Sequence, residues 1–138
     1  MTNDHPLNAY ILQPGEGVPG FATSVKASRA STGNTLTLIE SRTSGGAPLH
    51  VHRNEDEYLY VLEGAISVRC GDQTAQVEAH GFIFLPRGIP HSWDVIGEEA
   101  TVLMMTVPAM LAEFLQEFHA ASGEARHQIA EKYGITFV

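Results

Sequence analysis

Residues 49–64 have the sequence LHVHRNEDEYLYVLEG, which joins two histidines, a polar turn and an apolar run that ends in glycine. Side chains alternate between the two faces of a β-strand, so His50 and His52 are expected to point the same way. A hairpin through the polar residues would bring the carboxylate of Glu57 back beside the two imidazoles. Because Glu57 shares its face with apolar residues, it needs a partner, and a metal ion is one.

Two neighbouring carboxylates compete with Glu57 for this position. The strand alternation and the spacing to Gly64 favour Glu57, and Asp56 is the alternative ligand. Glu55 and Asp56 are otherwise expected to be solvated residues of the turn.

A second histidine-containing segment, FIFLPRGIPH, covers residues 82–91, where an apolar strand runs into a turn. Two prolines and a glycine fix that turn and therefore the direction in which His91 points. Three imidazoles and one carboxylate suit zinc, iron, nickel or copper, and manganese is a further candidate. Such a set leaves coordination positions open on a metal that prefers five or six ligands, which indicates a catalytic or ligand-binding site.

The first 107 residues contain short runs of β-branched, aromatic and aliphatic residues, separated by glycine and proline. This spacing is typical of an all-β sandwich or barrel. We expect hairpin turns at Glu63-Gly64 and at Glu98-Glu99. The predicted strands are 8–12, 20–28, 35–42, 49–52, 57–63, 65–70, 74–78, 82–85, 91–96 and 100–107.

After Pro108 the spacing of the apolar residues becomes helical. Ser122-Gly123 ends this first helix, and a second helix is expected at about 124–133, before a last strand at 135–138. The apolar stripe that includes Phe114 and Phe118 is expected to pack against the barrel or a second subunit, and not to bind a cofactor.

The length and composition exclude several classes of protein. The 138 residues suffice for one domain with its own core. Sixteen Asp and Glu against eight Lys and Arg, a net charge of −8, argue against binding to nucleic acid or to a membrane. The single cysteine excludes a cysteine-based zinc site, so a metal centre must use histidine and carboxylate ligands. The first residues lack a signal region, which predicts a soluble cytoplasmic protein.

Two motifs of this chain resemble those of the cupin superfamily. The first is His50-x-His52-x-x-x-x-Glu57 with six residues to Gly64, and the second is Pro86-x-Gly88-x-x-His91. The resemblance implies a double-stranded β-helix, or jelly-roll barrel, with one or two C-terminal helices. It implies a single cupin domain over 1–138, with a barrel core at about 20–107 and a helical tail at 109–133.

The same resemblance implies one divalent metal ion per chain (Fe, Ni, Mn, Zn or Cu). The implied metal ligands are His50, His52, Glu57 and His91. A homodimer is also implied, with the terminal strands or the Phe114–Phe118 stripe at the interface.

Three positions depart from the cupin pattern. Ser44 stands six residues before His50, where a glycine is usual, and Gly45 and Gly46 follow it. His80-Gly81 stands where a Gly-Asp pair usually opens the second motif, and we interpret His80 as a turn residue that replaces glycine. Val95 stands in place of a frequent asparagine and makes the predicted pocket more apolar. The predicted substrate pocket comprises Trp93, Leu59, Val61 and Val95. A position in the core is the alternative for Trp93, and Leu59, Val61 and Phe84 are also expected to fill the core. Three further histidines lie outside both motifs: His5, His119 and His127, of which the last two are expected on the surface.

Three functions follow as hypotheses. The first is a dioxygenase that acts on a small aromatic or enolisable substrate, flavonol-like or diketone-like, because the chain is similar to quercetin dioxygenase-like cupins. In that reaction Glu57 would act as the base that deprotonates the substrate hydroxyl. The second is a non-oxidative, metal-dependent cyclase or isomerase of the polyketide type. The third is a cupin that binds a small molecule without turnover.

Overall fold

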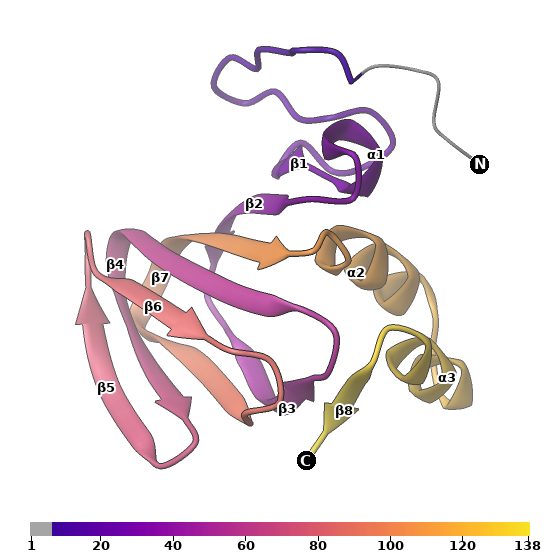
Figure 1. Ribbon diagram of the computed structural model, residues 1–138. Helices are drawn as coiled ribbons and strands as arrows, with labels where there is room; N and C mark the ends of the chain where they lie inside the picture. Colours follow the sequence, from indigo (N-terminus) through magenta and orange to yellow (C-terminus); the bar gives the residue numbers. More distant parts are fainter. Residues whose placement is uncertain (1–6) are drawn as a thin grey trace.

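A computed structural model describes residues 7–138, so His5 lies outside the described residues. The chain folds into a jelly-roll barrel that is followed by two helices and a last strand (Figure 1). The strands are β1 (Val25–Ala27), β2 (Thr37–Thr43), β3 (Ala47–His52), β4 (Asp56–Cys70), β5 (Gln73–Glu78), β6 (Phe82–Leu85), β7 (His91–Val107) and β8 (Ile135–Phe137). The helices are α1 (Arg29–Thr32), α2 (Leu111–Ala120) and α3 (Glu124–Lys132).

Two long antiparallel strands form the spine of the barrel. β4 has 15 residues and β7 has 17, and they pair from Asp56 opposite Val107 to Cys70 opposite His91. β5 and β6 pair with the other edge of β4, while β2 and β3 pair with β7. In Figure 1 these strands curl into one open-sided barrel, and α2, α3 and β8 lie on its open side.

The predicted hairpins at Glu63-Gly64 and Glu98-Glu99 are wrong, because both segments lie inside continuous strands. Gly64 has φ +79°, and the pairing register with β7 shifts on either side of Glu63, so a bulge bends β4 without ending it. A Cβ atom at Gly64 would lie 2.7 Å from the carbonyl oxygen of Glu99 on β7. Glycine is needed here both for the backbone conformation and for this close approach.

The N-terminal segment also differs from the sequence prediction. Residues 8–12 form no strand, and only Val25–Ala27 of the predicted strand 20–28 is extended and paired. The short helix α1 was not predicted. Ser28 and Ser31 form a capping box at its start, and Gly33 ends it in the left-handed conformation. A single turn of helix has too few residues to show an apolar period, so its capping residues are its sequence signal.

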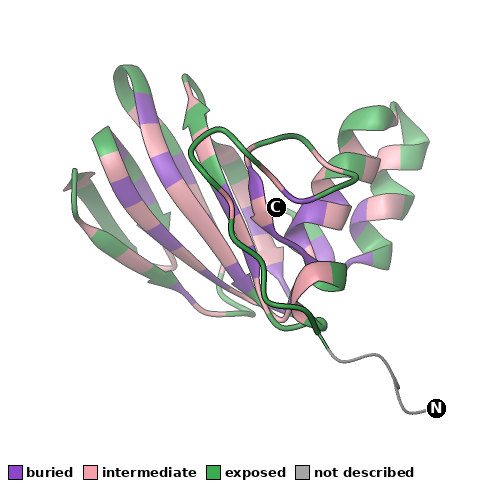
Figure 2. Ribbon diagram, turned by 90° about the horizontal axis from the view of Figure 1, so that it is seen from above, coloured by how far each residue is buried: buried purple, intermediate pink, exposed green. Residues whose placement is uncertain are grey.

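The buried side chains form two clusters that meet at the half-buried Met104. One cluster fills the barrel and includes Leu59, Val61 and Trp93. The other lies between β2 and the helices and includes Phe114, so the predicted packing of the helical stripe against the barrel is confirmed. Figure 2 shows the buried residues along the inner face of the sheet and on the helix faces toward it. The predicted homodimer stays a prediction.

No helix among the described residues 7–138 is long and apolar enough to cross a membrane.

Candidate metal centre

Three strand ends bring the predicted ligands together. His50 and His52 lie at the C-terminal end of β3, Glu57 is the second residue of β4, and His91 is the first residue of β7. β3 pairs with β7 so that His50 lies opposite His91. In the described sheet β3 and β4 pair with β7 and not with each other, so the predicted hairpin between them is wrong. Curling of the sheet brings Glu57 to the histidines instead.

The four side chains offer ligand atoms that all lie within 4.8 Å of one another, and all four residues are buried. The Nε2 atoms of His50 and His52 are 3.0 Å apart. Glu57 Oε1 lies 3.4 Å from Nε2 of His52 and 3.3 Å from Nε2 of His91. Ligand atoms about 2.1 Å from a metal ion and at right angles to each other are about 3 Å apart, so these spacings fit one ion.

The hydrogen bonds of two histidines orient their lone pairs toward that common point. His50 Nδ1 lies 2.6 Å from the Pro48 carbonyl oxygen, and His52 Nδ1 lies 3.0 Å from Glu55 Oε1. We assign the ring proton to Nδ1 in both residues, because only a donor can bond to these acceptors. Two unprotonated Nε2 atoms then face each other at 3.0 Å, an arrangement that a shared cation stabilises.

His91 gives a second, independent indication of a metal ion. Its side chain is 1% exposed, its Nδ1 has no hydrogen-bond partner among the described residues, and its Nε2 faces the Glu57 carboxylate at 3.3 Å without hydrogen-bond geometry. A buried polar atom without a partner costs about 1–3 kcal/mol. A metal ion at the common point would bind Nε2 of His91 and remove that cost for this atom.

The electrostatics favour the metal-binding protonation state at His50 and Glu57, while at His52 they favour the protonated ring, whose proton a metal ion would displace. Burial lowers the pKa of His50 to about 4, so this imidazole is neutral at neutral pH. For His52, burial also lowers the pKa, but the hydrogen bond to Glu55 and the charge of Glu57 outweigh it and raise the pKa. Burial raises the pKa of Glu57, yet the facing imidazoles of His91 and His52 outweigh burial and lower it. Glu57 is therefore a carboxylate.

The structure corrects the prediction for Glu55. This side chain is fully buried and accepts a hydrogen bond from His52, so it is not a solvated turn residue. Its sequence signal was its position three residues after His52, but a turn residue and a histidine partner cannot be told apart from spacing. A carboxylate behind a metal-binding histidine fixes the ring orientation and raises the basicity of the ligand.

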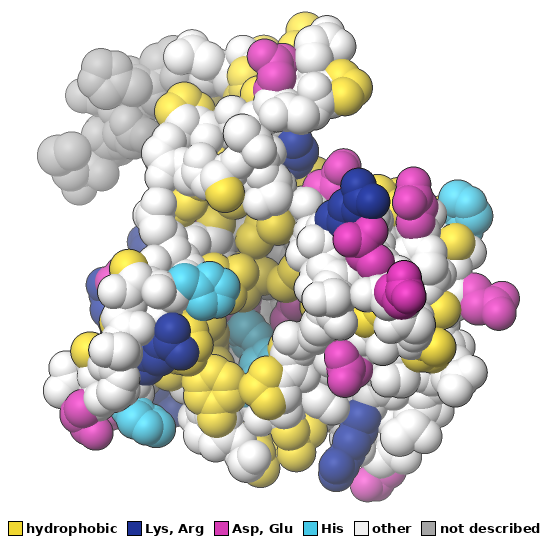
Figure 3. Space-filling model, turned by 180° about the vertical axis from the view of Figure 1, so that it is seen from behind, with side chains coloured by type: hydrophobic (Ala, Val, Ile, Leu, Met, Phe, Trp, Pro, Cys, Tyr) yellow, Lys and Arg dark blue, Asp and Glu magenta, His cyan; other side chains and the backbone are white. Residues whose placement is uncertain are grey.

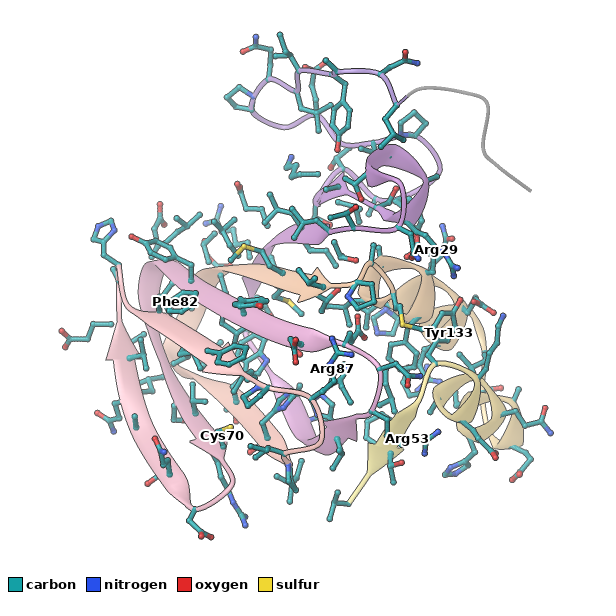
Figure 4. All side chains as sticks on the ribbon, viewed as in Figure 1. Arg29, Arg53, Cys70, Phe82, Arg87 and Tyr133 are labelled. Atoms are coloured by element: carbon teal, nitrogen blue, oxygen red, sulfur yellow. The ribbon has the colours of Figure 1, made fainter. Side chains whose placement is uncertain are left out.

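Asp56, the alternative ligand, faces away from the cluster. Its carboxylate accepts hydrogen bonds from the backbone N–H and the guanidinium of Arg87, in the turn after β6 (Figure 4). These hydrogen bonds lower the pKa of Asp56. The pair ties the turn that precedes His91 to the start of β4.

A cavity of about 160 Å³ opens beside the ligands. Figure 3 shows a hollow with histidine and acidic side chains in its depth and hydrophobic side chains around it. Trp93 lines this cavity, whereas Leu59 and Val61 are fully buried in the barrel cluster and Val95 packs against that cluster. The lining that the described residues provide does not include Leu59, Val61 or Val95.

Sequence reasoning missed one wall of the cavity. Helix α2 and strand β8 contribute Leu111, Phe114, Leu115, Phe118, His119, Ile135 and Phe137. The helical period predicted an apolar face, but whether that face packs or lines a cavity depends on where the helix docks.

The structure also shows where the residues predicted to lie outside the metal site are found. His80 is exposed and has φ +73°, which confirms that it is a turn residue in a conformation that favours glycine. His119 and His127 are exposed, as predicted. Phe84 is 49% exposed on the outer face of β6, so the prediction of a core position is wrong.

A family model for the cupin domain matches residues 38–107, which contain all four predicted ligands. The chain belongs to the cupin family. This cupin is 23% identical over 124 residues to quercetin 2,3-dioxygenase of Bacillus subtilis (strain 168), in a match that covers 86% of this chain and 37% of the relative. The chain thus spans little more than a third of the length of that curated relative.

Solved structures share the cupin fold at low identity. KdgF from Halomonas sp. is 16% identical, with a TM-score of 0.54 over 62% of this chain and 76% of that chain. An RmlC-like cupin from Shewanella frigidimarina NCIMB 400 is 20% identical, with a TM-score of 0.50 over 55% of this chain and 68% of that chain. Both similarities concern the fold alone.

Proposed function

We propose that this cupin is a metal-dependent dioxygenase for a small aromatic or enolisable substrate. One observation carries the proposal: three imidazole Nε2 atoms and the Glu57 carboxylate converge at an apolar cavity. The cavity leaves one side of the cluster accessible to a small molecule, as a catalytic metal centre requires. The similarity to quercetin 2,3-dioxygenase supports oxygen chemistry over other metal-dependent reactions.

Each residue of the site would have a distinct role. His50, His52 and His91 would hold a divalent ion, and Glu57 would complete the set. When bound, such an ion supplies Lewis acidity toward an enolate or phenolate oxygen and, if it is redox-active, one-electron chemistry with dioxygen. Glu57, which lines the cavity, would accept the substrate hydroxyl proton. Trp93 and the wall from α2 would exclude water from the substrate.

The test measures oxygen uptake after metal analysis of the purified protein. A panel of flavonols, β-diketones and aromatic enols is offered to the metal-loaded and the metal-free protein. We expect uptake with at least one compound, only in the loaded form, and none in Glu57→Gln that has been loaded to the same metal content. Turnover without oxygen would refute the dioxygenase proposal in favour of a cyclase or isomerase. Full metal occupancy without turnover would refute catalysis of this kind.

A further inference from the structure

The cavity beside the metal ligands is small for the compounds that flavonol chemistry would involve. Its volume is about 160 Å³. A cavity of about 150 Å³ holds a molecule of the size of benzene, and pockets for drug-sized ligands are about 300–1,000 Å³. One six-membered ring therefore fills this cavity.

The wall that limits the cavity is packed from behind. Phe118 on α2 contacts Phe114 and Phe137, with ring centroids 5.0 and 5.7 Å apart. The guanidinium of Arg126 on α3 lies 4.7 Å from the centroid of the Phe118 ring. Tyr133, after α3, hydrogen-bonds to Glu117 of α2 (Figure 4). These contacts hold α2 against the barrel, so a ligand that extends toward α2 would have to displace packed aromatic rings.

The charges around the cavity restrict the ligand further. A divalent ion with three neutral imidazoles and the Glu57 carboxylate keeps a net charge of about +1. The lining contributed by residues 7–138 includes neither lysine nor arginine, and most of its side chains are apolar. A ligand with one negative charge is neutralised by the metal centre, whereas a second charge would find no lysine or arginine in this lining.

We propose that the site selects singly charged enols or phenols no larger than one six-membered ring, and that Phe118 and Phe137 set this limit. The inference rests on the proposed function, because it assigns the substrate class of the same metal centre. Replacement of Phe137 gives the more specific test of the two. Phe137 lies on β8, its ring centroid is 6.1 Å from that of the ligand His50, and its side chain is 41% exposed.

The test compares two probes with the same metal-binding head. 3-Hydroxypyran-4-one has one ring, and 3-hydroxyflavone carries the same hydroxyketone with a fused benzene ring and a phenyl ring added. Binding is measured by calorimetry on zinc-loaded protein, because zinc is not redox-active and no turnover interferes. Trp93, the single tryptophan, lines the cavity, so its fluorescence reports whether the pyranone binds there.

We expect the pyranone to bind the wild type at least about tenfold more tightly than the flavone. Phe137→Ala and Phe118→Ala should each reduce this ratio by improving flavone binding. Phe84→Ala, a matched exposed phenylalanine on the outer face of β6, should leave the ratio unchanged. Thermal melts show that each variant is folded, and the two wall variants provide independent tests.

Equal or tighter binding of the flavone to the wild type would overturn the size limit. An unchanged ratio in both wall variants would overturn the role of Phe118 and Phe137, and pyranone binding without a change in Trp93 fluorescence would overturn the assigned cavity. A protein that holds no zinc would instead refute the metal centre, and with it the proposed function.

Discussion

Replacement of Glu55 by glutamine tests how the metal centre is supported. Glu55 is fully buried, and its Oε1 accepts the hydrogen bond from His52 Nδ1 at 3.0 Å. Glutamine has nearly the same shape and can still accept this bond, but it removes the negative charge behind the imidazole. His52 then becomes a weaker ligand, while the metal-free fold loses only a buried carboxyl group whose second oxygen has no partner among the described residues.

The expected magnitude follows from measured effects of such partners. Loss of a group behind a metal ligand weakens metal binding about 10–100-fold, which is about 1.4–2.7 kcal/mol. With free metal at about 100 times the wild-type Kd, binding raises the free energy of unfolding by about 2.7 kcal/mol. Tenfold weaker binding leaves about 1.4 kcal/mol under the same conditions. For a chain of this length the difference lowers the metal-induced rise in Tm by about 4–6 °C.

The assay is a pair of thermal melts, with and without zinc, for the wild type and Glu55→Gln. The matched control is Glu99→Gln, the same replacement in an exposed pair with Arg42 that touches no ligand. The control should change the metal-free Tm little and keep the full metal-induced rise. Glu55→Gln should keep the metal-free Tm, or increase it, and lose part of the rise. An undiminished rise in Glu55→Gln would refute the role of Glu55.

Three further predictions concern the same barrel. His91→Ala should abolish stoichiometric metal binding and keep the fold, while His80→Ala should keep the wild-type metal content. Elemental analysis of the purified variants measures this. A full metal content in His91→Ala would disprove the ligand assignment. Because the pKa of His50 is lowered from 6.5 to about 4, its contribution to stability is complete above pH 6.5 and is lost as the pH falls toward 4. Urea unfolding of the metal-free protein should show this loss, and His50→Ala should show less of it; an equal loss in both contradicts the prediction. Gly46→Ala should lower the free energy of unfolding by at least about 2 kcal/mol, because its Cβ would lie 1.9 Å from a carbonyl oxygen of β7. A Cβ at Gly45 would have no atom within 4 Å, so Gly45→Ala should lower it by less than about 1 kcal/mol in the same unfolding assay.

The ligand set could be predicted because each ligand carries a local signal. The alternation of His50 and His52 on one strand fixes their common direction, and the turn with two prolines fixes that of His91. The structure places Glu57, and not Asp56, beside the three histidines, because alternation along β4 puts Glu57 with the buried residues. The role of Glu55 could not be predicted, since its hydrogen bond depends on how the turn after β3 is buried.

The strand boundaries show where local reasoning fails. Gly64 and the glycine at position 97 both indicate a turn, and both have positive φ, yet β4 and β7 continue through them. A bend and a chain reversal use the same residue types. Only the pairing of the two strands over their full length decides between them.

The sequence by itself determined the fold class and the chemistry of the metal centre, because alternation, turn residues and ligand types act over a few neighbouring residues. The tertiary structure decided what surrounds that centre. Helix α2 and strand β8 follow the barrel in the chain, and their docking turns an ordinary apolar stripe into the wall that sets the size of the cavity. That docking depends on contacts between residues far apart in sequence, such as Phe118 with Phe137 and Phe137 with His50, which no local pattern records.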